Sequence, residues 1–483
     1  MKTLQDLSQD GNVSFGTSGV RALVTDLTPQ INYAFARAFL TQVCPSSRAV
    51  AIGIDLRPSS PTIANAMILA AEDLNIEVIY CGELPTPALA YFAMTQQIPA
   101  IMVTGSHIPF DRNGFKFYTQ NGEISKIHEQ AILSDVITTN NPLQGRSDKY
   151  VKVSSKALEA FKERYLSIFP DGFLKGKRIG IYEHSSVARD IINDLLNHFG
   201  ADVLSLERTN TFIPIDTEAV SKEDQQKALT WSAEHNLDAI VSTDGDGDRP
   251  LISDEEGKWL RGDVVGILVS QYLKATHVSC PINANTALEL SNPELVTLRT
   301  RIGSPYVIEG MVQLATENPN ASVVGYEANG GFLTGSSFKV NTSILTPLPT
   351  RDSILPMLAI LASTAEKNKS IRELALSLPA RYTASDRIKD IPSDTSKRLI
   401  SKLISNEAIK LSLIDTLLEQ DQANVININE TDGLRLTLSS QDIVHFRASG
   451  NAPELRCYAE SESQSRAENL VGNSLDWAKT NKR

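Results

Sequence analysis

The residues best able to do chemistry lie in the segment "DGDGDR", where three aspartates alternate with glycines. Asp244, Asp246 and Asp248 would repel one another at this spacing unless a cation neutralised them. The glycines let the backbone turn the carboxylates toward one point. A ligand set made only of oxygens suits Mg²⁺ or Ca²⁺ rather than a soft metal. The segment therefore predicts a divalent-metal site.

The segment has three other interpretations. An EF-hand would place Glu255 at its twelfth position, but the sixth position is Arg249 instead of glycine and Pro250 follows it. Strand patterns also flank the segment where an EF-hand needs helices, which excludes that motif. A phosphatase with Asp244 as its nucleophile stays open, because a hydrophobic run before "DGDG" resembles such sites. An exposed acidic turn is the plainest alternative.

A second reactive segment is "VTGSHIPFDRNGFKF", residues 103–117. Ser106 follows an apolar run and lies in a loop that the turn sequence "DRNG" closes. Serine is a weak nucleophile that needs a base, a metal or prior phosphorylation. His107 and Lys116 could serve as acid and base, or donate hydrogen bonds to a phosphate. The segment does not match G-x-S-x-G, so a hydrolase elbow is not expected, and an ordinary polar loop is the alternative.

Three further segments carry groups that bind hydroxyls or phosphates. In "GYEANGG", Glu327 and Asn329 stand between glycines, which suits the recognition of sugar hydroxyls. The other two combine an arginine with hydroxyl groups at a glycine turn, and such a turn can cradle a phosphate. They contribute Arg447, Ser449 and Asn451 from "RASGNAPELR", and Thr17, Ser18 and Arg21 from "FGTSGVR". Taken alone, each could equally be an exposed turn.

Regular elements must hold these loops, and the sequence pattern indicates them. "AVAIGID" (residues 49–55) predicts a buried strand, and residues 60–74 have apolar side chains at helical spacing. "EVIYCG" and "AIMVTG" predict the next strands, so the region consists of βαβ units with a largely parallel sheet. Residues 178–207 repeat the order strand, loop, helix, strand. A third α/β unit runs from "RGDVVGILVSQYL" through "ASVVGYEANGGF".

The pattern changes after about residue 376, and "GLRLTLSSQDIVHFRASGNAPELRCYAES" alternates in the manner of antiparallel strands. The predicted fold class is therefore α/β, with three α/β domains of related topology and a smaller C-terminal α+β domain. The predicted domains are residues 1–150 with the serine loop, 151–256 with the metal loop, 257–372 with the sugar loop, and 373–483 with the phosphate loop.

Composition sets the broad class. The chain has 483 residues, 41% of them hydrophobic, which fits a globular protein of several domains. The net charge of −11 argues against a nucleic-acid partner, although a local basic pocket could still bind a small anion. No secretory signal or membrane span is expected, so the predicted location is cytoplasmic. Reduced, structural thiols are expected at Cys44, Cys81, Cys280 and Cys457.

Taken in this order and spacing, the segments resemble the α-D-phosphohexomutase family over nearly the whole chain. The resemblance rests on "GTSGVR", "VAIGIDLRPSS", the serine loop, "DGDGDR", the sugar loop and the phosphate loop. It implies four domains around a central cleft. It also implies an isomerase that moves a phosphoryl group between the 1- and 6-positions of a hexose phosphate. The expected partner is thus a small phosphosugar, and the oligomeric state, monomer or dimer, is left open.

The resemblance also implies roles for the residues. Ser106 would be carried as phosphoserine and would donate its phosphoryl group to give a hexose 1,6-bisphosphate. Mg²⁺ would be held by Ser106 and the three aspartates of the metal loop. For the general base, Lys116 is the first candidate and His107 the second. The resemblance would place Arg21, His107, Lys116 and Arg249 around the reacting phosphate, Thr17, Ser18, Glu327 and Asn329 against the substrate, and Arg447, Ser449, Gly450 and Asn451 around the other phosphate.

Three loops depart from the usual family pattern. In "TGSHIP", Gly105 is expected to loosen the loop and Ile108 removes an amide near the serine. "GYEANGG" shifts the glutamate by one residue and lacks the usual histidine, and "GNAP" replaces Gly-Thr-Glu-Pro. We expect an unchanged reaction class and a preference for mannose phosphates, with glucose and then glucosamine phosphates as alternatives. A phosphosugar phosphatase and a non-catalytic phosphosugar-binding protein are the alternatives of another class.

Overall fold

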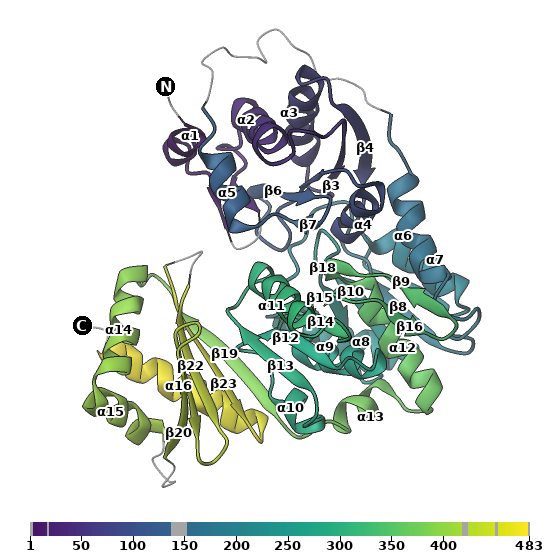
Figure 1. Ribbon diagram of the computed structural model, residues 1–483. Helices are drawn as coiled ribbons and strands as arrows, with labels where there is room; N and C mark the ends of the chain where they lie inside the picture. Colours follow the sequence, from purple (N-terminus) through teal and green to yellow (C-terminus); the bar gives the residue numbers. More distant parts are fainter. Residues whose placement is uncertain (1–2, 17–18, 137–151, 418–423, 450–452, 482–483) are drawn as a thin grey trace.

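Figure 1 shows the computed structural model of the chain, in which residues 3–16, 19–136, 152–417, 424–449 and 453–481 are described. Its main sheets follow one another along the chain, and each carries its own helices. We refer to the four resulting parts as the N-terminal, second, third and C-terminal units.

The N-terminal unit is built on a seven-stranded sheet. Its strands are β1 (Ser14–Phe15), β2 (Val20–Leu23), β3 (Ala49–Ile54), β4 (Glu77–Glu83), β5 (Ala100–Val103), β6 (Arg112–Thr119) and β7 (Gly122–Glu123). Its helices are α1 (Leu4–Asp10), α2 (Pro29–Ala38), which continues as the π-helix η1 (Phe39–Val43), α3 (Ser60–Asp73), α4 (Thr86–Gln96) and α5 (Lys126–Leu133). The predicted strand and helix in residues 49–74 are thus confirmed to within one residue at each end.

The second unit has a four-stranded sheet. It consists of α6 (Lys156–Leu166), β8 (Arg178–Tyr182), α7 (Arg189–His198), β9 (Asp202–Leu206), α8 (Lys222–His235), β10 (Ala239–Thr243) and β11 (Pro250–Ile252).

The third unit has a five-stranded sheet and a small separate hairpin. Its strands are β12 (His277–Pro281), β13 (Val296–Thr300), β14 (Val323–Tyr326), β15 (Phe332–Thr334) and β18 (Leu348–Asp352), with the hairpin of β16 (Phe338–Val340) and β17 (Ser343–Leu345). Its helices are α9 (Gly262–Tyr272), α10 (Ala287–Ser291), α11 (Ser304–Glu317), α12 (Ile354–Lys367) and α13 (Ile371–Leu376).

One strand arrangement recurs in these three units. The first strand lies between the second and the third, parallel to both, and the fourth returns antiparallel beside the third. The orders are β4-β3-β5-β6, β9-β8-β10-β11 and β13-β12-β14-β15. Parallel neighbours need a long crossover, whereas the antiparallel return needs only a loop. The predicted relation between the three α/β domains is therefore confirmed.

The C-terminal unit is an antiparallel five-stranded sheet, which stands to one side of the other three units in Figure 1. It consists of β19 (Tyr382–Ile388), α14 (Ser393–Ser405), α15 (Glu407–Leu417), β20 (Val425–Asn429), β21 (Leu434–Leu438), β22 (Ile443–Ala448), β23 (Leu455–Ser461) and α16 (Gln464–Asn481). The α/β class with a smaller α+β unit is thus confirmed, while the exact domain boundaries stay predictions.

The repeated arrangement decides where three of the predicted loops lie. The serine loop joins β5 to β6, the metal loop joins β10 to β11, and the sugar loop joins β14 to β15. Each loop thus occupies the same place in its own unit, between the third and fourth strands. Among the described helices, none is both long and apolar enough to cross a membrane.

Candidate active site

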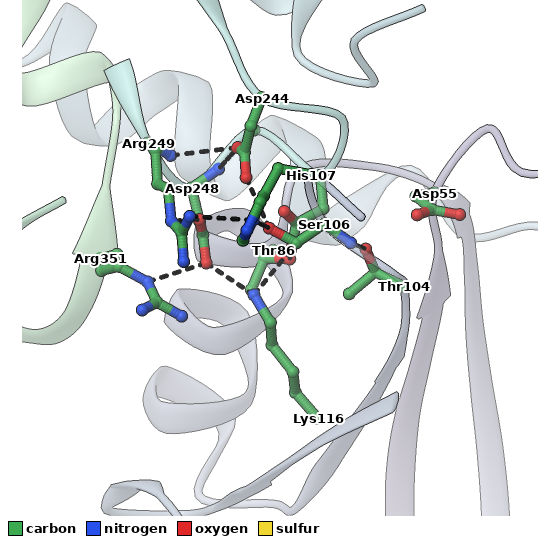
Figure 2. A network of polar contacts seen from close by, with 12 residues as sticks. Asp55, Thr86, Thr104, Ser106, His107, Lys116, Asp244, Asp248, Arg249 and Arg351 are labelled. Carbon is green, nitrogen blue, oxygen red and sulfur yellow. Dashed lines mark hydrogen bonds and ion pairs between the residues drawn. The ribbon is translucent and has the colours of Figure 1, made fainter. Parts of the chain in front are cut away.

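Ser106 lies at the centre of a network of polar contacts (Figure 2). Its backbone has φ +52°, a left-handed conformation that residues other than glycine rarely adopt. The Ser106 amide donates to Thr104 Oγ1 at 2.7 Å, which helps to hold this turn. The Ser106 hydroxyl is buried and donates to Asp244 Oδ2 at 2.6 Å, so the serine loop and the metal loop meet at the reactive oxygen.

The serine loop is held from behind by Arg57, which the sequence analysis did not single out. Its buried guanidinium donates to the carbonyl oxygens of Ser106 at 2.8 Å and Ile108 at 2.6 Å, and to two further carbonyls of the loop. A Cβ at Gly105 would lie 2.5 Å from the Arg57 guanidinium carbon. Gly105 therefore makes room for Arg57, and the loop is anchored rather than loosened.

The carboxylates of the metal loop share their contacts with other units. Asp246 Oδ2 accepts from Thr86 Oγ1 at 2.6 Å and from Lys116 Nζ at 2.7 Å, both in the N-terminal unit. Asp248 Oδ2 accepts from Lys116 Nζ at 2.6 Å and from Arg351 Nε, in the third unit, at 3.0 Å. The loop is therefore fixed where three units meet.

The three carboxylates fit a divalent cation. One oxygen from each lies within 4.8 Å of the others, and all three residues are buried. In the part of the chain that the structure describes, this is the only cluster of three or more such ligands. The remaining oxygens, Oδ1 of Asp246 and Oδ1 of Asp248, are buried without a hydrogen-bond partner among the described residues. Buried acceptors of this kind need a donor or a metal ion.

The electrostatics of the cluster indicate that positive charge is missing. Burial, reinforced by Asp246 and Asp248, raises the pKa of Asp244 well above its usual value. Burial also opposes the charge of Asp246, but Lys116 and the Thr86 hydrogen bond outweigh it and hold the pKa of that carboxyl below its usual value. One carboxylate of the three is thus poorly compensated, and a divalent cation would favour its ionised form.

His107 and two arginines line the other side of Ser106. Arg249 Nη1 donates to His107 Nδ1 at 2.9 Å. His107 Nδ1 also lies 3.3 Å from Ser106 Oγ. Burial, together with Arg249 and Arg21, lowers the pKa of His107 well below its usual value, so the imidazole is neutral. Arg21 Nη1 donates to the carbonyl of Thr104 at 2.8 Å, at the base of the serine loop.

The sugar loop is connected to this cluster through a second arginine that the sequence analysis missed. Arg351 Nη1 donates to Glu327 Oε2 at 3.1 Å, while Nε of the same guanidinium contacts Asp248. Asn329 shapes its own turn, because its Oδ1 accepts from the Gly331 amide at 3.0 Å. Thr86 and Arg351 carried no motif signal, since each stands alone among residues typical of strands and helix starts. Arg57 lies in the segment "VAIGIDLRPSS", but that segment gave no indication of what the arginine contacts.

The predicted phosphate loop lies elsewhere. Arg447, on β22, pairs through Nε with Asp432 Oδ2 at 2.7 Å, and the Ser449 amide donates to the carbonyl of Glu454 at 3.0 Å. Both therefore belong to the C-terminal sheet and not to the network around Ser106. Four predicted substrate-binding residues fall outside the described part of the chain: Thr17, Ser18, Gly450 and Asn451.

Comparison with known proteins agrees with this fold. Three domain models of the phosphoglucomutase/phosphomannomutase family match the chain: the α/β/α domain I over residues 12–142, the α/β/α domain III over 261–382, and the C-terminal domain over 387–473. A Burkholderia thailandensis protein of this family, known from its crystal structure, has a TM-score of 0.71 at 17% identity and covers 99% of this chain and 98% of its own.

Two relatives found by sequence have a higher identity to this chain than that structure has. A phosphomannomutase from Salmonella muenchen is 47% identical over 96% of this chain and 95% of its own, and one from Sinorhizobium fredii is 39% identical over 95% and 98%. These relatives define the class of the protein, an enzyme of the mutase type. The chain belongs to the phosphoglucomutase/phosphomannomutase family.

Proposed function

We propose that the protein interconverts hexose 6-phosphate and hexose 1-phosphate through a phosphoserine at Ser106. The observation that carries this proposal is the 2.6 Å hydrogen bond from Ser106 Oγ to Asp244, which joins a strained, buried serine to a cluster of three carboxylates. A phosphoryl group on Ser106 would meet the cationic side chains of Arg249 and Arg21, which suit its charge.

In the first half-reaction, one phosphoryl group moves from Ser106 to the sugar. The bond between phosphorus and Ser106 Oγ breaks, a bond to the free hydroxyl of the sugar forms, and the hydroxyl proton returns in net terms to the serine oxygen. The bisphosphorylated sugar then reorients in the site. In the second half-reaction its other phosphoryl group moves to Ser106, which re-forms phosphoserine. Lys116 and His107 are the candidates to carry the proton, because both lie beside the serine and metal loops.

The three aspartates and Ser106 would hold Mg²⁺ with oxygen ligands only. When bound, the ion would stabilise negative charge that develops on the transferred group. Two buried carboxylate oxygens, Oδ1 of Asp246 and Oδ1 of Asp248, have no hydrogen-bond partner among the described residues and support this role. Lys116 supplies a further positive charge at 2.6–2.7 Å from the same two residues.

For the substrate we propose mannose phosphates, supported by the names of the relatives from Salmonella muenchen and Sinorhizobium fredii. Glu327 is the proposed reader of sugar hydroxyls, with Asn329 beside it. Arg447, Ser449, Gly450 and Asn451 would hold the phosphate that does not react, and Thr17 and Ser18 would add contacts from the N-terminal unit. A cytoplasmic location is part of the proposal, supported by four free cysteines.

The test is turnover of mannose 1-phosphate and glucose 1-phosphate with Mg²⁺ and a trace of hexose 1,6-bisphosphate. We expect isomerisation of mannose 1-phosphate with the higher kcat/KM, and a loss of at least about a thousandfold in Ser106→Ala, because a nucleophile acts as part of a unit. A chelator should stop turnover. Ser46→Ala, in an exposed turn between η1 and β3, is the matched control and should retain full activity.

Two other outcomes would contradict the proposal. Release of free phosphate that survives in Ser106→Ala but not in Asp244→Asn would indicate a phosphatase with an aspartate nucleophile. Binding of mannose 1-phosphate in calorimetry without any turnover would indicate a non-catalytic binding protein.

A further inference from the structure

Arg351 is a buried cation that contacts all three units of the site. It is the second-last residue of β18, before Asp352, and its side chain is only 4% exposed. Nε lies 3.0 Å from Asp248 Oδ2 of the metal loop, and Nη1 lies 3.1 Å from Glu327 Oε2 of the sugar loop. Nη2 lies 4.0 Å from Glu123 Oε1 in the N-terminal unit. Figure 2 shows the guanidinium directed at Asp248, on the side of the metal loop away from Thr104.

The guanidinium group can act as a spacer between carboxylates. It is planar, stays charged at all relevant pH values, and presents its N–H donors at fixed angles. Since Asp248 and Glu327 bind the same rigid group, a displacement of one changes the geometry of the other. A lysine would place a single flexible ammonium there and could not hold both carboxylates in the same way.

The sugar loop is shaped to admit this arginine. A Cβ at Gly331 would lie 2.5 Å from Arg351 Cδ and 2.7 Å from Cγ, distances too short for any side chain. The last glycine of "GYEANGG" thus provides the space that Arg351 occupies. The departure of this loop from the usual family pattern is therefore matched by a specific neighbour on β18.

We propose that Arg351 is a positioning residue that couples binding of the metal ion to binding of the sugar. Its contact with Asp248 makes its position depend on whether metal is bound to the metal loop. Its contact with Glu327 fixes the position of the carboxylate that would bind sugar hydroxyls. Bound metal would fix the position of Asp248. Arg351 would then be held in place by Asp248, and Glu327 by Arg351. Sugar and metal should then each increase the affinity of the protein for the other, by the same factor. This inference rests on the proposed roles of the metal and sugar loops.

The coupling can be measured by calorimetry in the unphosphorylated protein without hexose 1,6-bisphosphate, where no phosphoryl donor is present and turnover cannot disturb the titration. Mannose 1-phosphate is titrated with and without Mg²⁺, and Mg²⁺ with and without mannose 1-phosphate. With Arg351 present, each ligand should tighten the binding of the other about tenfold, a typical coupling between sites. In Arg351→Lys the factor should fall close to one, and mannose 1-phosphate should bind more weakly even with Mg²⁺.

Matched variants separate coupling from loss of structure. Arg178→Gln removes an arginine whose ion pair with Asp202 is exposed, and it should leave the coupling factor unchanged. Glu327→Gln keeps an acceptor for Arg351 but removes its charge, and should also abolish most of the coupling. If circular dichroism shows that Arg351→Lys does not fold, Glu327→Gln still tests the proposal, because it alters the carboxylate that Arg351 contacts.

A coupling factor unchanged in both Arg351→Lys and Glu327→Gln would overturn the inference, as would a factor of one with Arg351 present. Failure of the proposed function is a separate result. It would appear as absent turnover in the protein with Ser106, whereas the binding titrations do not depend on turnover. Weaker binding of mannose 1-phosphate in Arg351→Lys with an unchanged coupling factor would identify a plain substrate contact and would also count against the proposal.

Discussion

At the scale of single residues, the site consists of buried charges that compensate one another. Lys116 is 1% exposed and lies between two carboxylates that are equally buried. Removal of one partner from such a pair costs about 3–5 kcal/mol, because the other charge is left unsolvated. Substitution of Lys116 is therefore a poor test of a catalytic role, since it would also destabilise the metal loop.

A buried histidine makes stability depend on pH. Burial lowers the pKa of His445 to about 4, and its Nε2 donates to the carbonyl of Asp432. An unfolded histidine titrates near pH 6.5, so acid favours the unfolded state. The stability that His445 contributes is present above pH about 6.5 and is lost as the pH falls to about 4, a loss of about 3 kcal/mol.

Urea unfolding at a series of pH values checks this expectation. The free energy of unfolding of the wild type should fall more steeply between pH about 6.5 and about 4 than that of His445→Gln, which has no proton to gain. Parallel curves for the two proteins would show that His445 is not buried in its neutral form.

Sequence reasoning found Ser106 and the three aspartates because their types and spacing carry chemical meaning. It missed Arg57 and Arg351, since a lone arginine gives no local signal of what it will contact. The glycines opposite them, Gly105 and Gly331, were noticed only as departures from a pattern. Their reason is steric, and it becomes visible only when the facing side chain is known.

At the scale of elements, three loops with different chemistry occupy one position in a repeated unit. Each connects the last parallel strand to its antiparallel return, at β5–β6, β10–β11 and β14–β15. The strands could be predicted, because short apolar runs bounded by turn residues are typical of them. The close approach of helix starts to these loops could not, because it depends on packing between segments distant in the sequence.

The contact between α9 and the sugar loop gives a prediction. A Cβ at Gly262, the first residue of α9, would lie 2.1 Å from the Gly330 nitrogen and 2.4 Å from the Ala328 oxygen, both backbone atoms. Gly262→Ala should therefore displace the sugar loop and lower kcat/KM for mannose 1-phosphate by about tenfold or more, since misplaced contacts of this kind are costly.

Gly472→Ala is the control for Gly262→Ala. Gly472 lies within α16 and has no atom within 4 Å of the position of a Cβ. Alanine there should leave kcat/KM unchanged and stabilise the helix by about 1 kcal/mol. Equal kinetics for both variants would show that the packing of α9 does not position the sugar loop.

At the scale of the whole molecule, the site exists only because separate units meet. The Ser106–Asp244 hydrogen bond joins residues 138 positions apart, and the Arg351–Asp248 bond joins residues 103 positions apart. Local patterns predict the units but not the faces by which they meet. For this chain the ordered set of motifs supplied that information through resemblance to a family whose loops converge. The phosphate loop of the C-terminal unit stays a prediction of the same kind.

The central claim, phosphoryl transfer through Ser106, is tested most directly by intact mass spectrometry. The protein is incubated with a hexose 1,6-bisphosphate and Mg²⁺, and Ser106→Ala is treated in parallel. We predict that the wild type gains the mass of one phosphoryl group, that fragmentation assigns it to Ser106, and that Ser106→Ala gains none. A wild type without added mass, or a Ser106→Ala protein labelled to the same extent, would contradict the account.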